Sequence, residues 1–279
     1  MYKITPEEYK VFTKYILDIS GIMLGIGKEY LIETRLNPIL TKLGCKSFAE
    51  LYHKLRMDQT KTIEKNIIDA ISTNETYFFR DKAPFELIQH KIIPDLIDTR
   101  SKIVKPGMPI KIRIWSAASS TGQEIYSIAI VLKELYLNPA KYEIKLLGTD
   151  ISNAAITQAS YGKYNKFEIA RGLPPEKARK YFNPDGDHWR IQDEIRSMAV
   201  FKKINLMQPF MGLGKFDIIF CRNVAIYFNP QERSRLYEKI AGVLEPDGYL
   251  LIGATESLTN DTKLFEPKKY LRAVFYQLK

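Results

Sequence analysis

Apolar side chains recur every three or four positions through the first seventy residues, a spacing that places them on one face of a helix. Thr5-Pro6-Glu7-Glu8 combines an N-cap, a proline at the first helical position and an acid three residues after the cap. A helix is therefore expected from this point to Gly21. Further helices are expected over 31–43, 48–57 and about 60–72. No strand-like alternation interrupts the region, which predicts an all-helical domain over 1–80.

Beyond residue 80 the pattern changes to short apolar runs that alternate with helical segments. A helix over 84–98 and a polar link over 101–109 come first. Strands are then expected over 110–115, 142–148, 216–221, 249–253 and 271–278, and helices over 123–136, 152–160 and 230–244. This alternation is typical of a mostly parallel sheet covered by helices on both faces, with ligands at the carboxyl ends of its strands. We expect an α/β domain of Rossmann-like type over 81–279.

Residues 161–197 interrupt the alternation. They are rich in Gly, Pro, Asn, Asp and basic residues, and Asn183-Pro-Asp-Gly186 is a strong turn signal between short strands. A small β insertion is predicted here. Lys and Arg exceed Asp and Glu by ten over the chain, and half of that excess lies in 157–215. The bias indicates either an acidic partner or simply a soluble basic surface.

Cysteine and histidine usage argues against a metal site. Cys45 and Cys221 lie far apart and belong to no metal-binding pattern, and three histidines are scattered, namely His53, His90 and His188. No run approaches the roughly 18 apolar residues of a membrane span. The first fifteen residues mix charges with apolar side chains, unlike a signal peptide. We expect a soluble, cytoplasmic protein without a metal or a disulfide framework.

Two loops carry small residues of the kind that approach ligands closely. The string Gly21 to Lys28 follows a helix, and Glu29 stands where a phosphate loop needs Ser or Thr, so a helix-to-helix connection is expected. Residues 115–124 instead leave the first strand and enter a helix, ending in Glu124. Asp150 ends the second strand, where nucleotide-binding sheets place an acid on ribose hydroxyls. Because Glu124 would repel a diphosphate, the pair favours a nucleoside without one, such as S-adenosylmethionine (SAM).

Three polar strings accompany these loops. Asn74-Glu-Thr-Tyr-Phe-Phe-Arg80 joins the two expected domains, and is either part of a site or a packed hinge with Arg80 paired to an acid. Cys221-Arg-Asn-Val-Ala-Ile-Tyr-Phe-Asn229 follows a buried strand, so Asn223 and Tyr227 are candidates to line the site. Asn205-Leu206 follows another strand and is placed to meet an adenine.

In combination these motifs resemble the CheR family, the SAM-dependent methyltransferases of bacterial chemotaxis receptors. The resemblance rests on Asn74-Glu-Thr-x-Phe-Phe-Arg80, the loop ending Gly122-x-Glu124, Gly148-Thr-Asp150 and Arg222-Asn-Val-x-Ile-Tyr-Phe228. It covers nearly the whole chain, and the small β insertion also matches the family's subdomain. It implies a SAM-methyltransferase sheet behind an N-terminal all-helical domain.

The resemblance also implies roles for individual residues. Arg80 and Tyr227 are the candidate catalytic residues, with Arg80 also touching the cofactor. The cofactor would be bound by Asn74, Thr76, Arg80, Glu124, Asp150, Asn205, Leu206, Arg222 and Asn223. The family's usual loop, Cys-Ser-x-Gly-Glu-Glu-Pro-Tyr-Ser, is altered here. Ser119, Gln123 and Ile125 replace its Cys, first Glu and Pro, and Ala225 stands where a larger aliphatic residue is common.

The function implied is methyl transfer from SAM to receptor glutamates, which gives glutamyl methyl esters. Two alternatives remain: a nucleic-acid methyltransferase, for which the Asn/Asp-Pro-Pro-aromatic string is missing, and a SAM-sensing scaffold that binds a receptor without catalysis. Since receptor methylation regions form acidic helical bundles, a basic helix is expected to dock there. The candidates are Lys42, Lys46, Lys54 and Arg56, with basic residues of the insertion as a second surface.

Overall fold

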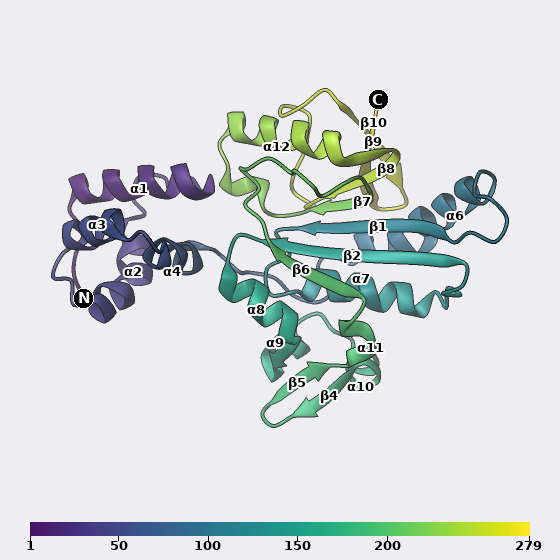
Figure 1. Cartoon of the computed structure of the whole chain (residues 1–279), viewed down its shortest axis with the longest axis horizontal. Coiled ribbons are helices and arrows are strands. Elements are labelled where there is room, and N and C mark those ends of the chain that lie inside the picture. Colours follow the sequence, from purple (N-terminus) through teal and green to yellow (C-terminus); the bar gives the residue numbers. More distant parts are fainter.

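The computed structural model describes residues 1–279, and its amino-terminal quarter forms a helical body beside the rest of the chain (Figure 1). This body contains α1 (Pro6–Ser20), α2 (Glu29–Leu43), α3 (Phe48–Met57) and α4 (Thr62–Ile71). The capping box at the start of α1 is present: the Thr5 hydroxyl accepts from the backbone N–H of Glu8, whose side chain accepts from the N–H of Thr5. Phe12, Leu36 and Phe48 are fully buried between these helices. The expected helical region is confirmed.

The second body begins with α5 (Ala83–Leu87), the π-helical turn η1 (Ile88–Ile92) and α6 (Ile93–Ser101), which follow one another without a break. Its main sheet has the strand order β6-β2-β1-β7-β8-β10-β9. The strands are β1 (Ile110–Ala117), β2 (Tyr142–Asp150), β6 (Ala199–Lys203), β7 (Phe216–Cys221), β8 (Leu244–Ile252), β9 (Phe265–Tyr270) and β10 (Ala273–Leu278). The first five strands in that order are parallel, β10 is antiparallel to β8, and β9 is antiparallel to β10. The expected α/β class is confirmed.

Helices cover both faces of this sheet. Helix α7 (Gln123–Glu134) follows β1, α8 (Asn153–Tyr161) follows β2, and α12 (Pro230–Val243) follows β7. Along β7, Ile218 and Phe220 belong to the core that contains α7, whereas Ile219 and Cys221 belong to the core that contains α12. Since successive residues of a strand point to opposite faces, the two helices lie on opposite sides of the sheet.

Two strand assignments differ from the sequence-based expectation. Strand β8 begins at Leu244, five residues before the expected start, and β9 was not expected. Both segments carry a proline and several charged residues, which lower the apparent strand propensity. β9 lies at the edge of the sheet. Pro267 has no backbone N–H to donate, and an edge strand tolerates this because only one of its sides is paired.

The insertion between β2 and β6 is a three-stranded antiparallel sheet with short helices (Figure 1). Its elements are β3 (Lys163–Asn165), α9 (Lys166–Ala170), α10 (Pro175–Tyr181), β4 (Phe182–Asp185), β5 (His188–Ile191) and α11 (Asp193–Arg196). The predicted sheet is present, but the helices of the insertion contain more residues than its strands. The hairpin turn lies at Gly186 and Asp187, so Asn183 to Asp185 are part of β4 rather than of the turn.

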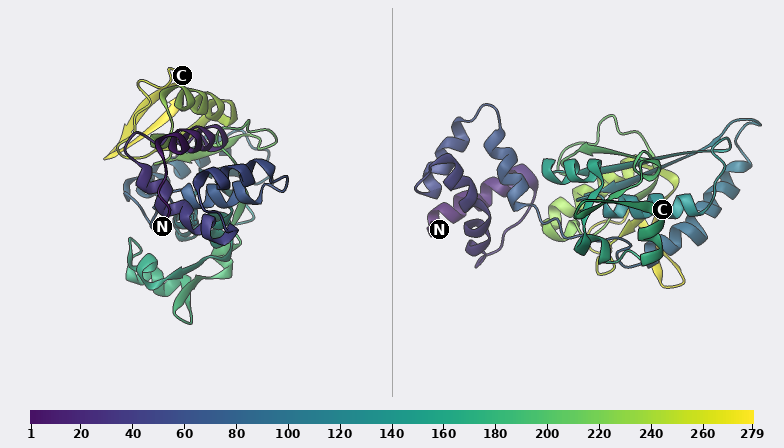
Figure 2. Two further views of the ribbon diagram at one scale, coloured as in Figure 1. Left: turned by 90° about the vertical axis from the view of Figure 1, so that its left-hand side faces the viewer. Right: turned by 90° about the horizontal axis from the view of Figure 1, so that it is seen from below.

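The helical body joins the sheet body through residues 72–82, and the right-hand view of Figure 2 shows the two bodies side by side with this connection between them. None of the helices combines the length and the apolarity that crossing a membrane requires. The end of α1 nevertheless reaches the main sheet, because the N–H of Met23 donates to the Tyr227 carbonyl (2.9 Å) and the Asn205 side chain donates to the Ile19 carbonyl (2.8 Å). A cavity lies between the two bodies, lined by the end of α1 and by loops of the main sheet.

Candidate active site

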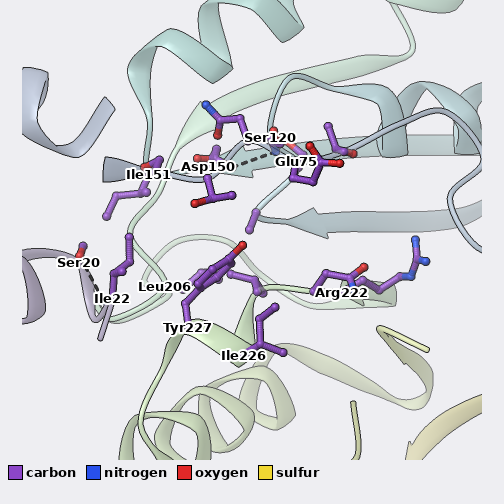
Figure 3. Close-up of a pocket in the computed structure, with 18 of the residues that line it drawn as sticks. Ser20, Ile22, Glu75, Ser120, Asp150, Ile151, Leu206, Arg222, Ile226 and Tyr227 are labelled. Carbon is purple, nitrogen blue, oxygen red and sulfur yellow. Dashed lines mark hydrogen bonds between the residues drawn. The ribbon is translucent and has the colours of Figure 1, made fainter. Parts of the chain in front are cut away.

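A cavity of about 1030 Å³, including its solvent-open part, lies at the carboxyl ends of β1, β2, β6 and β7. The strand order reverses direction between β1 and β7, the position at which parallel sheets bind ligands. All ten residues predicted for the site line this cavity, namely Asn74, Thr76, Arg80, Glu124, Asp150, Asn205, Leu206, Arg222, Asn223 and Tyr227. Figure 3 shows Asp150 and Glu75 on one side of the hollow, facing Leu206 and Tyr227 across it.

The loop after β1 forms one wall. Ala118, Ser120 and Gly122 all have positive φ, so the backbone winds tightly before α7 begins. Only glycine fits at residue 122, because a Cβ there would come within 3.1 Å of the Tyr164 hydroxyl, and its φ is 96°. The Tyr164 hydroxyl in turn donates to the Thr121 carbonyl (2.8 Å). Packing and hydrogen bonds therefore hold this loop, in which Ile125 stands where the family resemblance led us to expect a proline.

Asp150 joins that loop to the end of β2. Its Oδ2 accepts from the N–H of Ser120 at 2.9 Å (Figure 3). Its Oδ1 accepts from the N–H of Ser152, also at 2.9 Å. The side chain is almost fully buried, and this burial raises the pKa of the Asp150 carboxyl above its usual value. Each oxygen keeps a lone pair that a ligand hydroxyl can use.

Arg222 and Glu124 form a buried ion pair at the floor of the cavity. Arg222 Nη1 lies 2.7 Å from Glu124 Oε2, and Nη2 lies 2.7 Å from Asp81 Oδ2 and donates to the Arg80 carbonyl. The Ser116 hydroxyl donates to Glu124 Oε1 (2.7 Å). The Arg222 guanidinium therefore points away from the open part of the hollow, as Figure 3 shows, and ties three segments of the chain together.

The segment that carries Arg80 has a strained backbone, which neighbouring segments hold in place. Phe79, Asp81 and Lys82 all have positive φ, which costs non-glycine residues on the order of 1–3 kcal/mol each. The surroundings hold it in place: the N–H of Phe79 donates to the Ser127 hydroxyl (2.9 Å). Such strain is typical of functional segments.

Residues of the insertion also pack against the segment that precedes Arg80. The Phe78 ring packs edge-on against Tyr164 and Phe182, with centroids 5.0 and 5.4 Å away. A Cβ on Gly172 would overlap the Phe78 carbonyl oxygen, so only glycine lets the two segments approach. The insertion therefore fixes the backbone just before Arg80.

Arg80 itself is not paired with any acid. Its Nη1 donates to the Glu75 carbonyl (2.9 Å) and its guanidinium lies 5.6 Å from the Tyr77 ring centroid, while the Glu75 carboxylate is paired with Arg171. The alternative interpretation of residues 74–80 as a hinge with Arg80 paired to an acid is therefore wrong about the ion pair. A half-buried guanidinium with free donors faces the cavity.

The loop after β7 forms the wall opposite Asp150. It carries Asn223, whose φ is 58°, and Tyr227 in the short 3-10 turn η2 (Ala225–Tyr227). Neither the Asn223 side-chain amide nor the Tyr227 hydroxyl has a hydrogen-bond partner within the chain, so both remain available to a ligand. The sequence analysis missed Glu256, whose Oε2 accepts from the N–H groups of Asn223 (2.8 Å) and Gly253 (2.6 Å).

Asn205 and Leu206 close the cavity beside the helical body. The Asn205 side chain is used within the chain, since its amide donates to the Ile19 carbonyl and its oxygen accepts from the N–H of Met207. Ser20 and Ile22, from the end of α1, complete this wall and were not predicted. Nothing in the local sequence marks them, because only the packing of the helical body against the sheet brings them to the site.

The residues present suit a nucleoside with free hydroxyls. The Ser119 and Ser120 hydroxyls in the wall of the cavity are buried and lack any partner, which is costly unless a ligand satisfies them. Three acids, Glu75, Glu124 and Asp150, and two arginines, Arg80 and Arg222, line the cavity. Glu75 is paired with Arg171 and Glu124 with Arg222, so Asp150 is the acid of this set without a cationic partner. The cavity therefore offers hydrogen bonds for hydroxyls and one unpaired carboxylate.

Comparison with known proteins identifies the class. A family model described as "CheR methyltransferase, SAM binding domain" matches residues 74–274, and "CheR methyltransferase, all-alpha domain" matches residues 7–72. The chain belongs to the CheR methyltransferase family, and its cofactor is SAM. The resemblance drawn from the motifs is thus confirmed.

Individual relatives match over nearly their full length. The chain is 38% identical to "Chemotaxis protein methyltransferase 1" of Vibrio cholerae over 99% of this chain and 98% of that one. It is 35% identical to the protein of the same name from Pseudomonas aeruginosa, over 98% of each chain. A "Chemotaxis protein methyltransferase" of Borreliella burgdorferi is 38% identical over 94% of this chain and 92% of its own.

Proposed function

We propose that this protein transfers the methyl group of SAM to glutamate side chains of a chemoreceptor and so forms glutamyl methyl esters. The observation that carries the proposal is the convergence of all ten predicted residues on one cavity, in a chain whose two halves both match the CheR family. Chemotaxis methyltransferases at 35–38% identity over almost the whole chain support the same reaction.

The acceptor requires no base from the protein. A glutamate side chain has a pKa of about 4.3 in model peptides and is already an ionised nucleophile at neutral pH. Bound SAM supplies an electrophilic methyl group on its sulfonium. The chain's task is to hold the carboxylate in line with that methyl and to exclude water around it. This agrees with a cavity that contains no histidine and no reactive cysteine.

Arg80 and Tyr227 are the residues we assign to the acceptor side. Arg80 has free guanidinium donors, so it can orient a carboxylate that would otherwise be repelled by the acids of the cavity. The Tyr227 hydroxyl, free of partners within the chain, projects into the hollow from the loop after β7 (Figure 3). Its hydrogen bond to the acceptor would fix the direction of attack without removing the negative charge.

For the cofactor we assign Asp150 to the ribose hydroxyls, because it is the buried acid at the end of β2 with unused lone pairs. Glu124 contributes negative charge near the methionine ammonium. Arg222 acts through Glu124 and Asp81, since its guanidinium is used by these partners. Asn74 and Thr76 line the hollow on the side of the connecting segment, and Asn205, Leu206 and Asn223 surround the adenosine.

Receptor docking is assigned to the helical body. Lys42, Lys46, Lys54 and Arg56 are exposed around α3, and none of them forms an ion pair within the chain. In the insertion, by contrast, Lys163 is paired with Asp185, Lys177 with Glu134 and Arg171 with Glu75. Because the insertion's charge is partly neutralised, the set around α3 is the better surface for an acidic helical bundle.

The other two functions considered are not favoured. The match to the chemotaxis methyltransferases covers both bodies, which neither a nucleic-acid methyltransferase nor a non-catalytic scaffold accounts for. A single assay separates the three: radiolabelled SAM is incubated with the protein and either receptor-containing membranes or RNA. Base-labile label on the receptor supports the proposal, whereas label on RNA, or no transfer despite SAM binding, would contradict it. Asp187→Ala, in the exposed hairpin of the insertion, is a matched control.

A further inference from the structure

The carboxylate of Glu256 bonds to the backbone of the loop after β7. Glu256 lies beyond the end of β8, and its Oε2 accepts from the N–H of Asn223 (2.8 Å) and from the N–H of Gly253 (2.6 Å). Asn223 has φ 58°, in the left-handed region that side chains other than glycine adopt rarely. Glu256, which does not line the cavity, is therefore the side chain that bonds to the backbone N–H at this strained residue.

The environment leaves little freedom for this carboxylate. A Cβ on Gly253 would come within 2.6 Å of both Glu256 Oε2 and the Asn223 amide nitrogen, so the three residues are in close contact. Glu256 Oε1 is shielded from water and has no partner, and burial raises the pKa of the Glu256 carboxyl. A buried, incompletely satisfied acid is costly, which argues for a role beyond stability.

We propose that Glu256 is a positioning residue of the methyl-transfer site, whose Oε2 holds the loop after β7 in the turn that aims Asn223 and Tyr227 into the cavity. Asn223 lies at the turn itself, and Tyr227 follows four residues later in η2, with Ile226 between them at the cavity rim. Without the acceptor, the N–H of Asn223 loses its partner and the turn loses the contact that offsets its backbone strain.

This role requires a hydrogen-bond acceptor at one place and no charge. A glutamine at residue 256 keeps an oxygen that can accept both N–H groups, whereas alanine removes the acceptor and aspartate withdraws it by one methylene. Glu256→Gln is therefore expected to bind SAM and to turn over within about threefold of the unmodified protein. Glu256→Ala and Glu256→Asp are expected to lose about tenfold or more in both SAM affinity and kcat, since the N–H groups of Asn223 and Gly253 are left without an acceptor.

The experiment measures SAM affinity by calorimetry, kcat and KM with receptor membranes, and the thermal unfolding midpoint of each variant. Glu238→Ala, at an exposed position of α12, is the control and should match the unmodified protein. Unchanged kinetics in a folded Glu256→Ala, or equal losses in Glu256→Gln and Glu256→Ala, would overturn the inference. If Glu256→Ala does not fold, a fully active Glu256→Asp would overturn it instead.

The kinetic measurements rest on the proposed function, but the binding measurements need SAM alone. If the unmodified protein fails to methylate receptors, the proposed function fails, while the affinities of the three Glu256 variants still decide whether Glu256 organises the loop.

Discussion

Asp150→Ala is the most direct test of the cofactor side of the site. The substitution removes an acceptor that now bonds to the N–H groups of Ser120 and Ser152 and that faces the cavity with its remaining lone pairs. A hydrogen bond from a ribose hydroxyl to a carboxylate contributes about 1.5–3 kcal/mol. Since 1.36 kcal/mol corresponds to a factor of ten, SAM affinity is expected to fall roughly ten- to hundredfold.

Loosening of the loop after β1 would add to this loss, because the N–H of Ser120 is left without an acceptor. Titration calorimetry with SAM at fixed pH measures the effect, and a thermal unfolding scan establishes that the variant is folded. Asp187→Ala, an exposed acid of the insertion, should leave the affinity unchanged. A folded Asp150→Ala variant with the affinity of the unmodified protein would remove Asp150 from the site.

The same carboxyl gives the affinity a pH dependence of known sign. Burial raises the pKa of Asp150, and ribose donors favour the ionised form, so SAM binding must lower that pKa. Affinity is therefore expected to be constant at neutral pH and to fall as the pH decreases through the raised pKa of the free protein. The fall should be absent in Asp150→Ala. An equally steep fall in both proteins would place the titrating group elsewhere.

Three further predictions concern other parts of the site. Arg80→Ala and Tyr227→Phe are expected to lower kcat about tenfold or more while SAM affinity changes less, and loss of affinity alone would make both of them binding residues. Gly172→Ala pushes its methyl group into the backbone that precedes Arg80, so thermal stability should fall together with kcat; an unperturbed variant would show that the insertion does not clamp this segment. Charge reversal at Lys46 and Lys54 should raise the KM for receptor but not the SAM dissociation constant, and added salt should act in the same direction. Methylation that responds to neither change would locate receptor docking elsewhere.

Local patterns were sufficient for most of the secondary structure. The capping box at Thr5, the strand from Phe216 to Cys221 and the helix that starts at Pro230 are each encoded by neighbouring residues, and the structure has them there. The pattern failed at β9 and at the start of β8. These segments become strands because neighbouring strands supply hydrogen-bond partners, which a local pattern cannot express.

The candidate site was predictable for a related reason. Asp150 is the last residue of one parallel strand, Asn205 and Asn223 lie two residues beyond two others, and parallel strands end at one edge of a sheet. Residues that are far apart in the sequence could therefore be expected at one place once the α/β alternation was recognised. The motif at residues 74–80 was informative because three successive aromatics do not fit a helix with one apolar face.

Patterns along the chain were enough to predict the α/β class, the helical domain before it and the residue types that line the cavity, because periodicity and strand-end position depend on neighbours in the sequence. The hydrogen-bond and ion-pair partners of those residues follow only from the packing of distant segments. This packing pairs Arg222 with Glu124 and Asp81, leaves Arg80 free, and brings Ser20 and Glu256 to the site. Charge pairing and burial depend on which segments meet in space, and no local spacing encodes that.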